Sequence, residues 1–332
     1  MRAGGSTRRG FMASMGGVMA APSLVPSSAI AQQGALPVVG FLSSRTPKEA
    51  EYLVTAVRAG LKEAGCIEGQ NVTIEYRYAE SHNDRLPALA AELVARNVSV
   101  IVAGGTSGPA IAATKTVPIV FTTGFDPVAA GLVGSLNRPG GNVTGATFFS
   151  GALGAKQLEL LTAIAPNTTV FGLLIYISSK RNATQLRDAQ SAAQAIGREL
   201  HVFPAATESA IDAAFAALGK VPNAAMLISV DPFFDSHAPQ LIAAAARYRL
   251  PTAYYLRDFV RAGGLMSYGA SITDTYRQAG NYAGRIVKGE QPGDLPIQLP
   301  TKFELAINLK TAKTLGLTIP ASLLVTADEI VE

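Results

Sequence analysis

The sequence predicts an α/β protein with two similar lobes, each built around a parallel sheet. Short runs of β-branched residues alternate with Ala-rich segments of helical period, which is the pattern of consecutive βαβ units. The same order of strands and helices occurs twice, with the two first strands about 130 residues apart. One long doubly wound sheet is the alternative, but a sheet of that many strands tends to split, so we favour two lobes.

The first series begins at residue 38 and contains four strands and three helices. Its first helix has Leu53, Val57, Leu61 and Ala64 on one face, as expected for a helix that packs against a sheet. The predicted strands are residues 38–42, 72–78, 98–103 and 119–122, and the predicted helices are residues 48–64, 84–95 and 109–115.

The second series repeats this order from residue 170. The predicted strands are residues 170–176, 200–203, 225–230 and 252–255, and the predicted helices are residues 183–196, 209–218 and 239–248.

The remaining segments fall outside both series and predict a hinge of several crossings. They include strands at 143–149 and 303–307 and helices at 274–288 and 309–315. The simplest account is that the chain passes between the lobes near residues 145–152, 262–269 and 291–303. The N-terminal lobe is then 36–148 with 265–291, and the C-terminal lobe is 149–264 with 292–332.

The first 31 residues have the layout of a signal peptide. Arg2, Arg8 and Arg9 precede an apolar run at 11–21, and a cleavage pattern ends at Ala31. The Arg pair favours the twin-arginine route over the general one, although the Lys often seen further on is absent. A membrane anchor is the alternative, but the run is broken by glycine and is shorter than the roughly 20 residues of a spanning helix. We therefore expect a periplasmic protein cleaved near Ala31.

Charge and cysteine content narrow the possible functions. Residues 1–31 hold three Arg and no acid, so 28 basic and 24 acidic residues become 25 and 24, and the net charge falls from +4 to about +1. No basic stripe predicts binding to nucleic acid. Cys66 is the only cysteine, so we expect neither a lipid anchor at the cut nor an internal disulfide.

Catalytic patterns are nearly absent. His82, His201 and His237 fall in different kinds of element, and none has metal-ligand spacing to another ligand. The Gly-rich residues 103–108 match neither a nucleophile elbow, nor a dinucleotide fingerprint, nor a P-loop. We predict no catalytic residue, no metal and no cofactor.

Hydroxyl side chains follow the predicted strands of the first lobe. They are Ser43, Ser44, Thr106, Ser107 and Thr123. Ligands of open α/β sheets bind at the carboxyl ends of the strands, where the unpaired amides of the next helices suit a carboxylate. Each hydroxyl can instead be a helix N-cap, yet several at one sheet edge favour a binding site.

Two aspartates occupy matching places in the two series. Asp126 and Asp231 each precede a proline just after a strand, where either can accept hydrogen bonds from a ligand ammonium group. The alternative is that each simply caps the next helix, with proline at its first position. Tyr176, Tyr254 and Tyr268 supply large flat surfaces nearby, although some of the aromatic residues in this part of the chain are expected in the core.

Several strings resemble one protein family. The most specific are NRPGGNVTG at 137–145 and PTKFEL at 300–305, and they are accompanied by residues 36–44, 119–127 and 264–269. Together they closely resemble ABC-transporter substrate-binding proteins related to tryptophan-binding lipoproteins, over essentially all of residues 36–332. The chain departs from that branch by lacking the lipid-bearing cysteine, so the ligand is not carried over.

The resemblance implies the type I periplasmic-binding fold, with two Rossmann-like lobes, three crossovers and a ligand between the lobes. It also implies an importer with separate permease and ATPase subunits, so that the protein meets the membrane only through the permease. The positions that match the family's cleft-facing loops are Ser43, Ser44, Thr106, Ser107, Thr123, Asp126, Tyr176, Asp231, Tyr254 and Tyr268.

We therefore expect the periplasmic solute-binding component of an ABC importer, with a small polar organic ligand that is amino-acid-like or aromatic. The main alternative is a periplasmic sensor of the same fold that feeds a signalling partner. A repressor is disfavoured because a signal sequence, and no helix-turn-helix, precedes residue 36. An enzyme has the least support.

Overall fold

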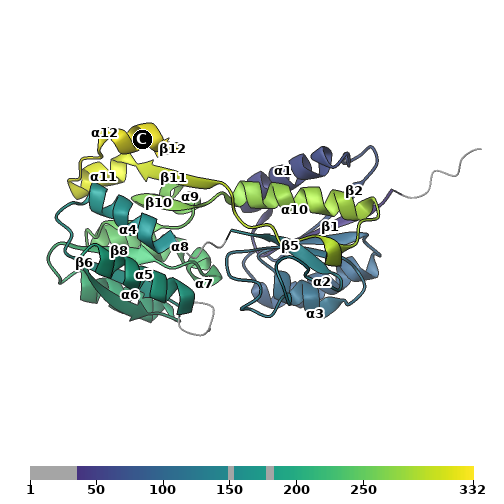
Figure 1. Ribbon diagram of the computed structural model, residues 1–332, viewed down its shortest axis with the longest axis horizontal. Coiled ribbons are helices and arrows are strands. Elements are labelled where there is room, and N and C mark those ends of the chain that lie inside the picture. The colour runs from purple at the N-terminus through teal and green to yellow at the C-terminus, as the bar shows by residue number, and fades with distance from the viewer. Residues whose placement is uncertain (1–35, 149–152, 177–182) are drawn as a thin grey trace, which may run out of the picture. The chain divides into compact units, whose positions relative to one another are not determined.

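The computed structural model describes residues 36–148, 153–176 and 183–332, and their strands form two separate sheets (Figure 1). The five-stranded sheet has the order β2-β1-β3-β4-β5, and the seven-stranded sheet has the order β12-β11-β10-β9-β8-β6-β7. This confirms the predicted α/β class with two sheets. The predicted signal peptide and residues 149–152 of the first predicted hinge lie outside the described residues.

The first sheet is parallel throughout and has helices on both faces. Its strands are β1 (Val38–Ser43), β2 (Thr73–Tyr78), β3 (Val100–Gly104), β4 (Ile119–Thr123) and β5 (Val143–Thr147). Its helices are α1 (Pro47–Glu63), η1 (Asn83–Arg85), α2 (Leu86–Ala95), α3 (Ser107–Ala113) and α10 (Ile272–Val287). Successive side chains of a strand point to opposite faces, so Phe41 packs with α1 and α10 while Leu42 packs with α2.

Local signals in the sequence explain where α1 begins. Thr46 accepts a hydrogen bond from the amide of Glu49 at 3.3 Å, and the Glu49 carboxylate accepts one from the amide of Thr46 at 3.0 Å. This reciprocal capping, with Pro47 at the first helical position, satisfies amides that have no partner within the helix.

Two glycines allow α1 and α10 to lie side by side (Figure 1). A Cβ atom built at Gly60 of α1 would overlap the backbone of Arg277 and lie 2.6 Å from the amide nitrogen of Asn281. A Cβ atom built at Gly280 of α10 would likewise overlap the backbone of Val57. The backbones of the two helices therefore touch at these glycines.

The second sheet is mixed. Its strands are β6 (Val170–Ile175), β7 (Glu199–Pro204), β8 (Ala224–Ile228), β9 (Thr252–Tyr254), β10 (Met266–Ala270), β11 (Phe303–Asn308) and β12 (Glu329–Val331). Only the β10–β11 pair is antiparallel among the described pairs. β10 leaves the sheet at its carboxyl end toward the first lobe, and β11 returns at that same end, so the two must run in opposite directions.

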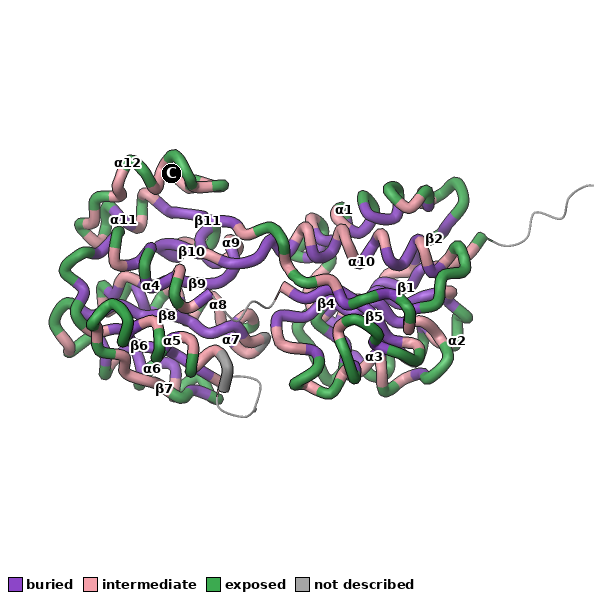
Figure 2. The backbone as a smooth tube through the Cα atoms, in the orientation of Figure 1, coloured by how far each residue is buried: buried purple, intermediate pink, exposed green. Residues whose placement is uncertain are grey.

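Helices cover both faces of this sheet. The strands of both sheets are mostly buried (Figure 2), except the edge strands β2, β7 and β12, which are largely half-buried or exposed. The helices are α4 (Leu153–Ile164), α5 (Ala183–Ala195), α6 (Glu208–Leu218), α7 (Pro232–Ser236), α8 (Ala238–Arg247), α9 (Arg257–Arg261), α11 (Leu309–Leu315) and α12 (Ala321–Thr326). α4 and α5 pack on one face, and α6 and α8 pack on the other.

Two of the expected lobe boundaries lie elsewhere. Residues 265–291 were expected in the first lobe, but the structure divides them, because β10 pairs with β9 in the second sheet and only α10 packs on the first. Residues 292–298 were expected in the second lobe. They lie against β5 instead, where Thr144 donates a hydrogen bond to the Leu295 carbonyl at 2.7 Å. The chain thus crosses at 271 and again at 299–302.

Candidate functional site

The carboxyl ends of three neighbouring strands meet at one edge of the first sheet. The strand registers set Ser43 of β1 beside Gly104 of β3, and Gly104 beside Thr122 of β4. The loops that follow carry Ser44, Thr106 with Ser107, and Thr123. The structure therefore brings the predicted hydroxyl residues of the first lobe to one sheet edge.

Several of these hydroxyls make local hydrogen bonds. Ser43 accepts from the amide of Arg45 at 3.2 Å, and Thr123 accepts from the amide of Phe125 at 3.4 Å. Thr106 precedes α3 but does not cap it, because its hydroxyl donates to the Leu42 carbonyl at 3.2 Å. The hydroxyls thus hold the loops in shape, and the first amides of α3 are left without a side-chain cap.

Both predicted aspartates act as backbone caps. Asp126 accepts from the amides of Val128 and Ala129 at 2.9 and 3.1 Å. Asp231 is the N-cap of α7 and accepts from the amide of Phe233 at 2.9 Å. The helix-capping alternative is therefore realised for Asp231, whereas Asp126 caps a turn, because no helix is assigned between β4 and β5. A role in ligand binding would use the same carboxylates in addition.

The predicted tyrosines have different surroundings. Tyr176 follows β6, and its ring centroid lies 5.1 Å from that of Phe233. Tyr268 lies within β10 and stacks on Phe303 at 6.0 Å. Tyr254 is 0% exposed and stacks on Phe259 in the core at 4.8 Å, so it has no surface to offer a ligand in this structure.

Charged side chains join the two lobes next to the predicted site. Arg45, in the loop after β1, donates to the Asp258 carboxylate of α9 at 3.1 Å. Tyr52 of α1 donates to the same oxygen at 2.5 Å, and its hydroxyl lies 3.1 Å from the Arg45 guanidinium. A cation is therefore held at the edge of the first sheet, immediately after Ser43 and Ser44.

A partly buried acid lies near this cation. Asp235 of α7 accepts a hydrogen bond from the Tyr255 hydroxyl at 2.6 Å. Burial raises the pKa of Asp235 from 3.8 to about 6, while the charge of Arg45 and the Tyr255 hydrogen bond partly oppose that rise. The carboxylates of Asp258 and Asp231 raise it further.

This environment predicts a pH-dependent contribution to stability. Between pH 4 and 6, Asp235 keeps a proton in the folded protein that it has released in the unfolded chain. The contribution of this carboxyl group to the free energy of unfolding is therefore complete below about pH 4 and is lost as the pH rises through about 6. Asp235→Asn keeps an acceptor for Tyr255 without the charge. It is expected to raise the free energy of unfolding at pH 7.5 by about 1–2 kcal/mol, after allowance for partial solvent access, and by little at pH 4.

Chemical denaturation at both pH values measures this effect. Asp84→Asn, at an exposed position in η1, is the matched control and should change neither value. An equal gain for Asp235→Asn at pH 4 and pH 7.5 would contradict the ionisation of Asp235 as the cause.

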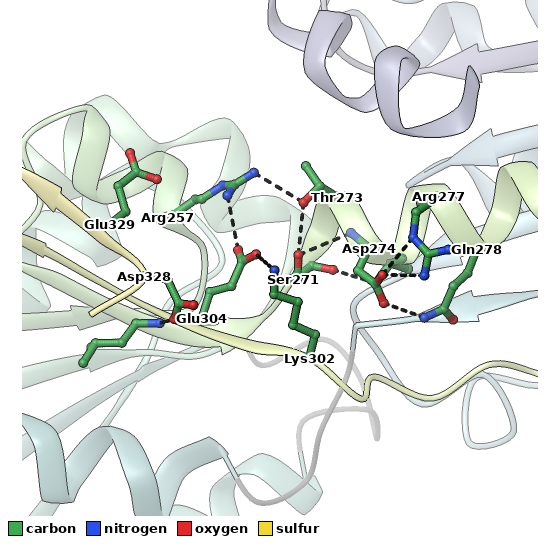
Figure 3. Close-up of polar contacts among 12 residues, drawn as sticks. Arg257, Ser271, Thr273, Asp274, Arg277, Gln278, Lys302, Glu304, Asp328 and Glu329 are labelled. Atoms are coloured by element: carbon green, nitrogen blue, oxygen red, sulfur yellow. Dashed lines mark hydrogen bonds and ion pairs between the residues drawn. The ribbon is translucent and has the colours of Figure 1, made fainter. Parts of the chain in front are cut away.

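Polar contacts drawn in Figure 3 join the second and third crossings between the lobes, at 271 and 299–302. The amide of Ser271 donates to the Lys302 carbonyl at 2.9 Å, and the Ser271 hydroxyl caps α10 by accepting from Asp274. Arg257 of α9 lies 3.4 Å from the Glu304 carboxylate and donates to the Thr273 hydroxyl at 3.4 Å (Figure 3). The two hinge segments are thus bonded to each other and to α9.

Sequence reasoning missed the charged residues of this region. Arg45 directly follows the predicted Ser43 and Ser44, so its place at the sheet edge was readable from the sequence. Its partner Asp258 is 213 residues away, and no local signal joins the two.

The described parts of the chain lack two further features. No group of three or more His, Cys, Asp or Glu side chains there can hold a metal ion. No helix within those ranges is long and apolar enough to cross a membrane.

Comparisons with known proteins agree with this architecture. A family model described as ABC transporter substrate binding protein matches residues 48–331. A tyrosine-binding protein of Clostridioides difficile (strain R20291) is 27% identical over 260 residues, covering 77% of this chain and 74% of that protein.

Solved structures show the same fold. A conserved domain protein from Vibrio cholerae is 27% identical with a TM-score of 0.77, covering 89% of this chain and 99% of that one. An ABC domain from Streptococcus pneumonia in complex with L-Trp is 25% identical with a TM-score of 0.79, covering 90% and 100%. The fold is the type I periplasmic-binding fold. The chain therefore belongs to the family of ABC transporter substrate-binding proteins.

Proposed function

We propose that this protein is the solute receptor of an ABC importer and that it captures an aromatic amino acid between the strand-end loops of its two lobes. The observation that carries the proposal is the ligand chemistry of two relatives that share most of its fold. One is named for tyrosine, and the other was solved with L-Trp. Both ligands combine a carboxylate, an ammonium group and a flat ring.

The strand-end loops offer groups for each part of such a ligand. Ser44, Ser107 and the uncapped amides of α3 suit the carboxylate, together with Thr123 and the Arg45 guanidinium. Asp126 or Asp231 suits the ammonium group. Tyr176, with the Phe233 ring tilted against it, and Tyr268 suit the ring. Tyr254 is left out of this set because its side chain is buried.

Mass spectrometry of small molecules released from the purified protein tests the proposal. A thermal-shift screen of amino acids, aromatic acids and amides should then show a rise with L-tryptophan or L-tyrosine, because a ligand that binds only the folded state stabilises it. A rise with sugars alone, or with none of the amino acids, would contradict an aromatic amino acid as the ligand.

Transport needs a permease and an ATPase, and we propose both as partners. Permease and ATPase genes next to the gene for this protein would support import. A neighbouring histidine kinase gene would support the sensor alternative.

Export is proposed on the layout of residues 1–31. The mature protein is expected in the periplasm and to begin near Gln32, as measured by N-terminal sequencing of that fraction. Changing Arg8 and Arg9 to Lys is expected to hold the protein inside the cell, because the twin-arginine route requires the Arg pair. Continued export of the double variant would instead favour the general route.

A further inference from the structure

A small cavity in the second lobe adjoins the proposed site. It has a volume of about 30 Å³ and lies between α4, α5 and the carboxyl ends of β6 and β8. Its walls combine Leu, Ile, Val and Ala side chains with the polar residues Gln157, Gln185 and Ser229. Val230, on its border, also faces the first lobe, because a Cβ atom built at Gly124 would lie 3.0 Å from the Val230 Cγ1 atom. The cavity therefore begins where loops of the two lobes meet.

Two glutamines in the cavity wall have fixed orientations. Gln185 pairs with the Val230 backbone, accepting from its amide at 2.8 Å and donating to its carbonyl at 3.1 Å. Gln157 of α4 donates through Nε2 to the carbonyls of Tyr254 and Tyr268 at 3.2 and 2.9 Å. Backbone groups therefore hold both side-chain amides in place.

A third polar residue of the wall has an unused hydroxyl. Ser229 is 4% exposed, and its Oγ atom has no hydrogen-bond partner among the described residues. Buried polar groups in folded proteins are nearly always paired with protein, water or ligand. Among the described residues of the cavity wall, Ser229 thus contributes a buried polar atom, Oγ, that is unused.

The size and chemistry of the cavity restrict what fills it. About 30 Å³ admits a group of the size of a water molecule and not a whole aromatic ring. The Ser229 hydroxyl can donate or accept, so a hydroxyl group of the occupant can pair with it in either role.

We infer that this cavity receives the distal end of the ligand's side chain and selects ligands that carry a hydroxyl group there, as the phenol of tyrosine does. The inference rests on the proposed function, since it assumes an aromatic amino acid in the adjoining site. A phenyl ring carries no polar group and leaves Ser229 Oγ unpaired. A site built to bond such a group discriminates strongly against the analogue that lacks it.

Calorimetric titration of the ligand-free protein with L-tyrosine, L-tryptophan and L-phenylalanine tests the inference. The unaltered protein is expected to bind L-tyrosine about 10-fold more tightly than L-phenylalanine. L-Tryptophan should show no such gain from the cavity, because its N–H belongs to a ring that the cavity does not admit. Ser229→Ala should reduce the preference for L-tyrosine over L-phenylalanine about 10-fold without weakening L-phenylalanine binding. The melting temperature of Ser229→Ala should not fall, because the hydroxyl has no partner to lose.

A second variant tests the cavity without touching its polar atoms. The three atoms nearest to a Cβ atom built at Gly154 of α4 all belong to Ala189, at 3.4 Å or more, so Gly154→Ala narrows the cavity at ordinary contact distance. It should weaken the preferred ligand several-fold and leave the melting temperature unchanged or higher, since alanine favours a helix. Ser191→Ala, at an exposed position of α5, is the control and should change nothing.

The outcomes separate the two proposals. If the unaltered protein binds the aromatic amino acids and both cavity variants keep its preference, the cavity holds only water and this inference fails while the proposed function stands. If the unaltered protein binds none of the three, the proposed function fails, and this inference fails with it.

Discussion

Asp231→Asn and Asp126→Asn, made singly, are each expected to weaken binding of the aromatic amino acid by about 10-fold to 150-fold. The lost charge-assisted hydrogen bond to the ligand ammonium group contributes about 1.5–3 kcal/mol. Asparagine still offers an amide oxygen to the backbone, so the caps on Phe233 and on Val128 with Ala129 are kept. Calorimetric titration with L-tryptophan and L-tyrosine measures the affinity.

The alanine variants at the same two positions are the matched controls for capping. Asp231→Ala and Asp126→Ala remove the cap as well as the charge, so they should also lower the free energy of unfolding by about 0.5–2 kcal/mol. If both asparagine variants bind with unaltered affinity, the two aspartates serve only as caps and the ammonium group binds elsewhere.

Gly60→Ala is expected to destabilise the ligand-free protein by about 2–4 kcal/mol. The added methyl group would overlap the backbone of α10 at Arg277 and Asn281, and a backbone cannot turn aside as a flexible side chain can. The gain of about 1 kcal/mol from the better helix propensity of alanine offsets only part of this. The midpoint of chemical denaturation, followed by circular dichroism, measures the change.

Gly108→Ala separates the steric effect from helix propensity. Gly108 lies in α3, and nothing is within 4 Å of the position of an added Cβ atom, so alanine there should be neutral or slightly stabilising. A Gly60→Ala variant as stable as the unaltered protein would show that α1 and α10 can move apart at low cost.

Much of the fold was predictable because its signals are local. The Phe41 and Leu42 positions show it, since opposite faces of one strand are both buried and such a strand reads as a short continuous apolar run. The start of α1 was likewise readable from Thr46, Pro47 and Glu49. The sequence did not predict which of the two sheets contains β10, because a short buried strand next to a glycine-rich turn fits either sheet.

The residues of the candidate site likewise include some that the sequence predicted and some that it did not. Ser43 and Thr123 were found because they follow strands, and the carboxyl ends of neighbouring parallel strands share one edge. Tyr176 and Tyr254 are both tyrosines near the end of a strand. Tyr176 contacts the Phe233 ring beyond the sheet, whereas Tyr254 is buried against Phe259. That difference depends on which helix covers each ring, and the residues next to each tyrosine in the sequence do not predict how the helices pack.

The sequence by itself determined the α/β class, the two sheets, the resemblance to a family and the strand ends that carry hydroxyls and aspartates. These follow from the spacing of hydrophobic residues along strands and helices, from turn residues and from short motifs, all of which are signals that span only a few residues. The tertiary structure alone decided where the chain crosses between the lobes, the link from Arg45 to Asp258 and the cavity beside Ser229 and Gln157. Each of these joins residues far apart in the chain, so it arises only when separate elements pack together.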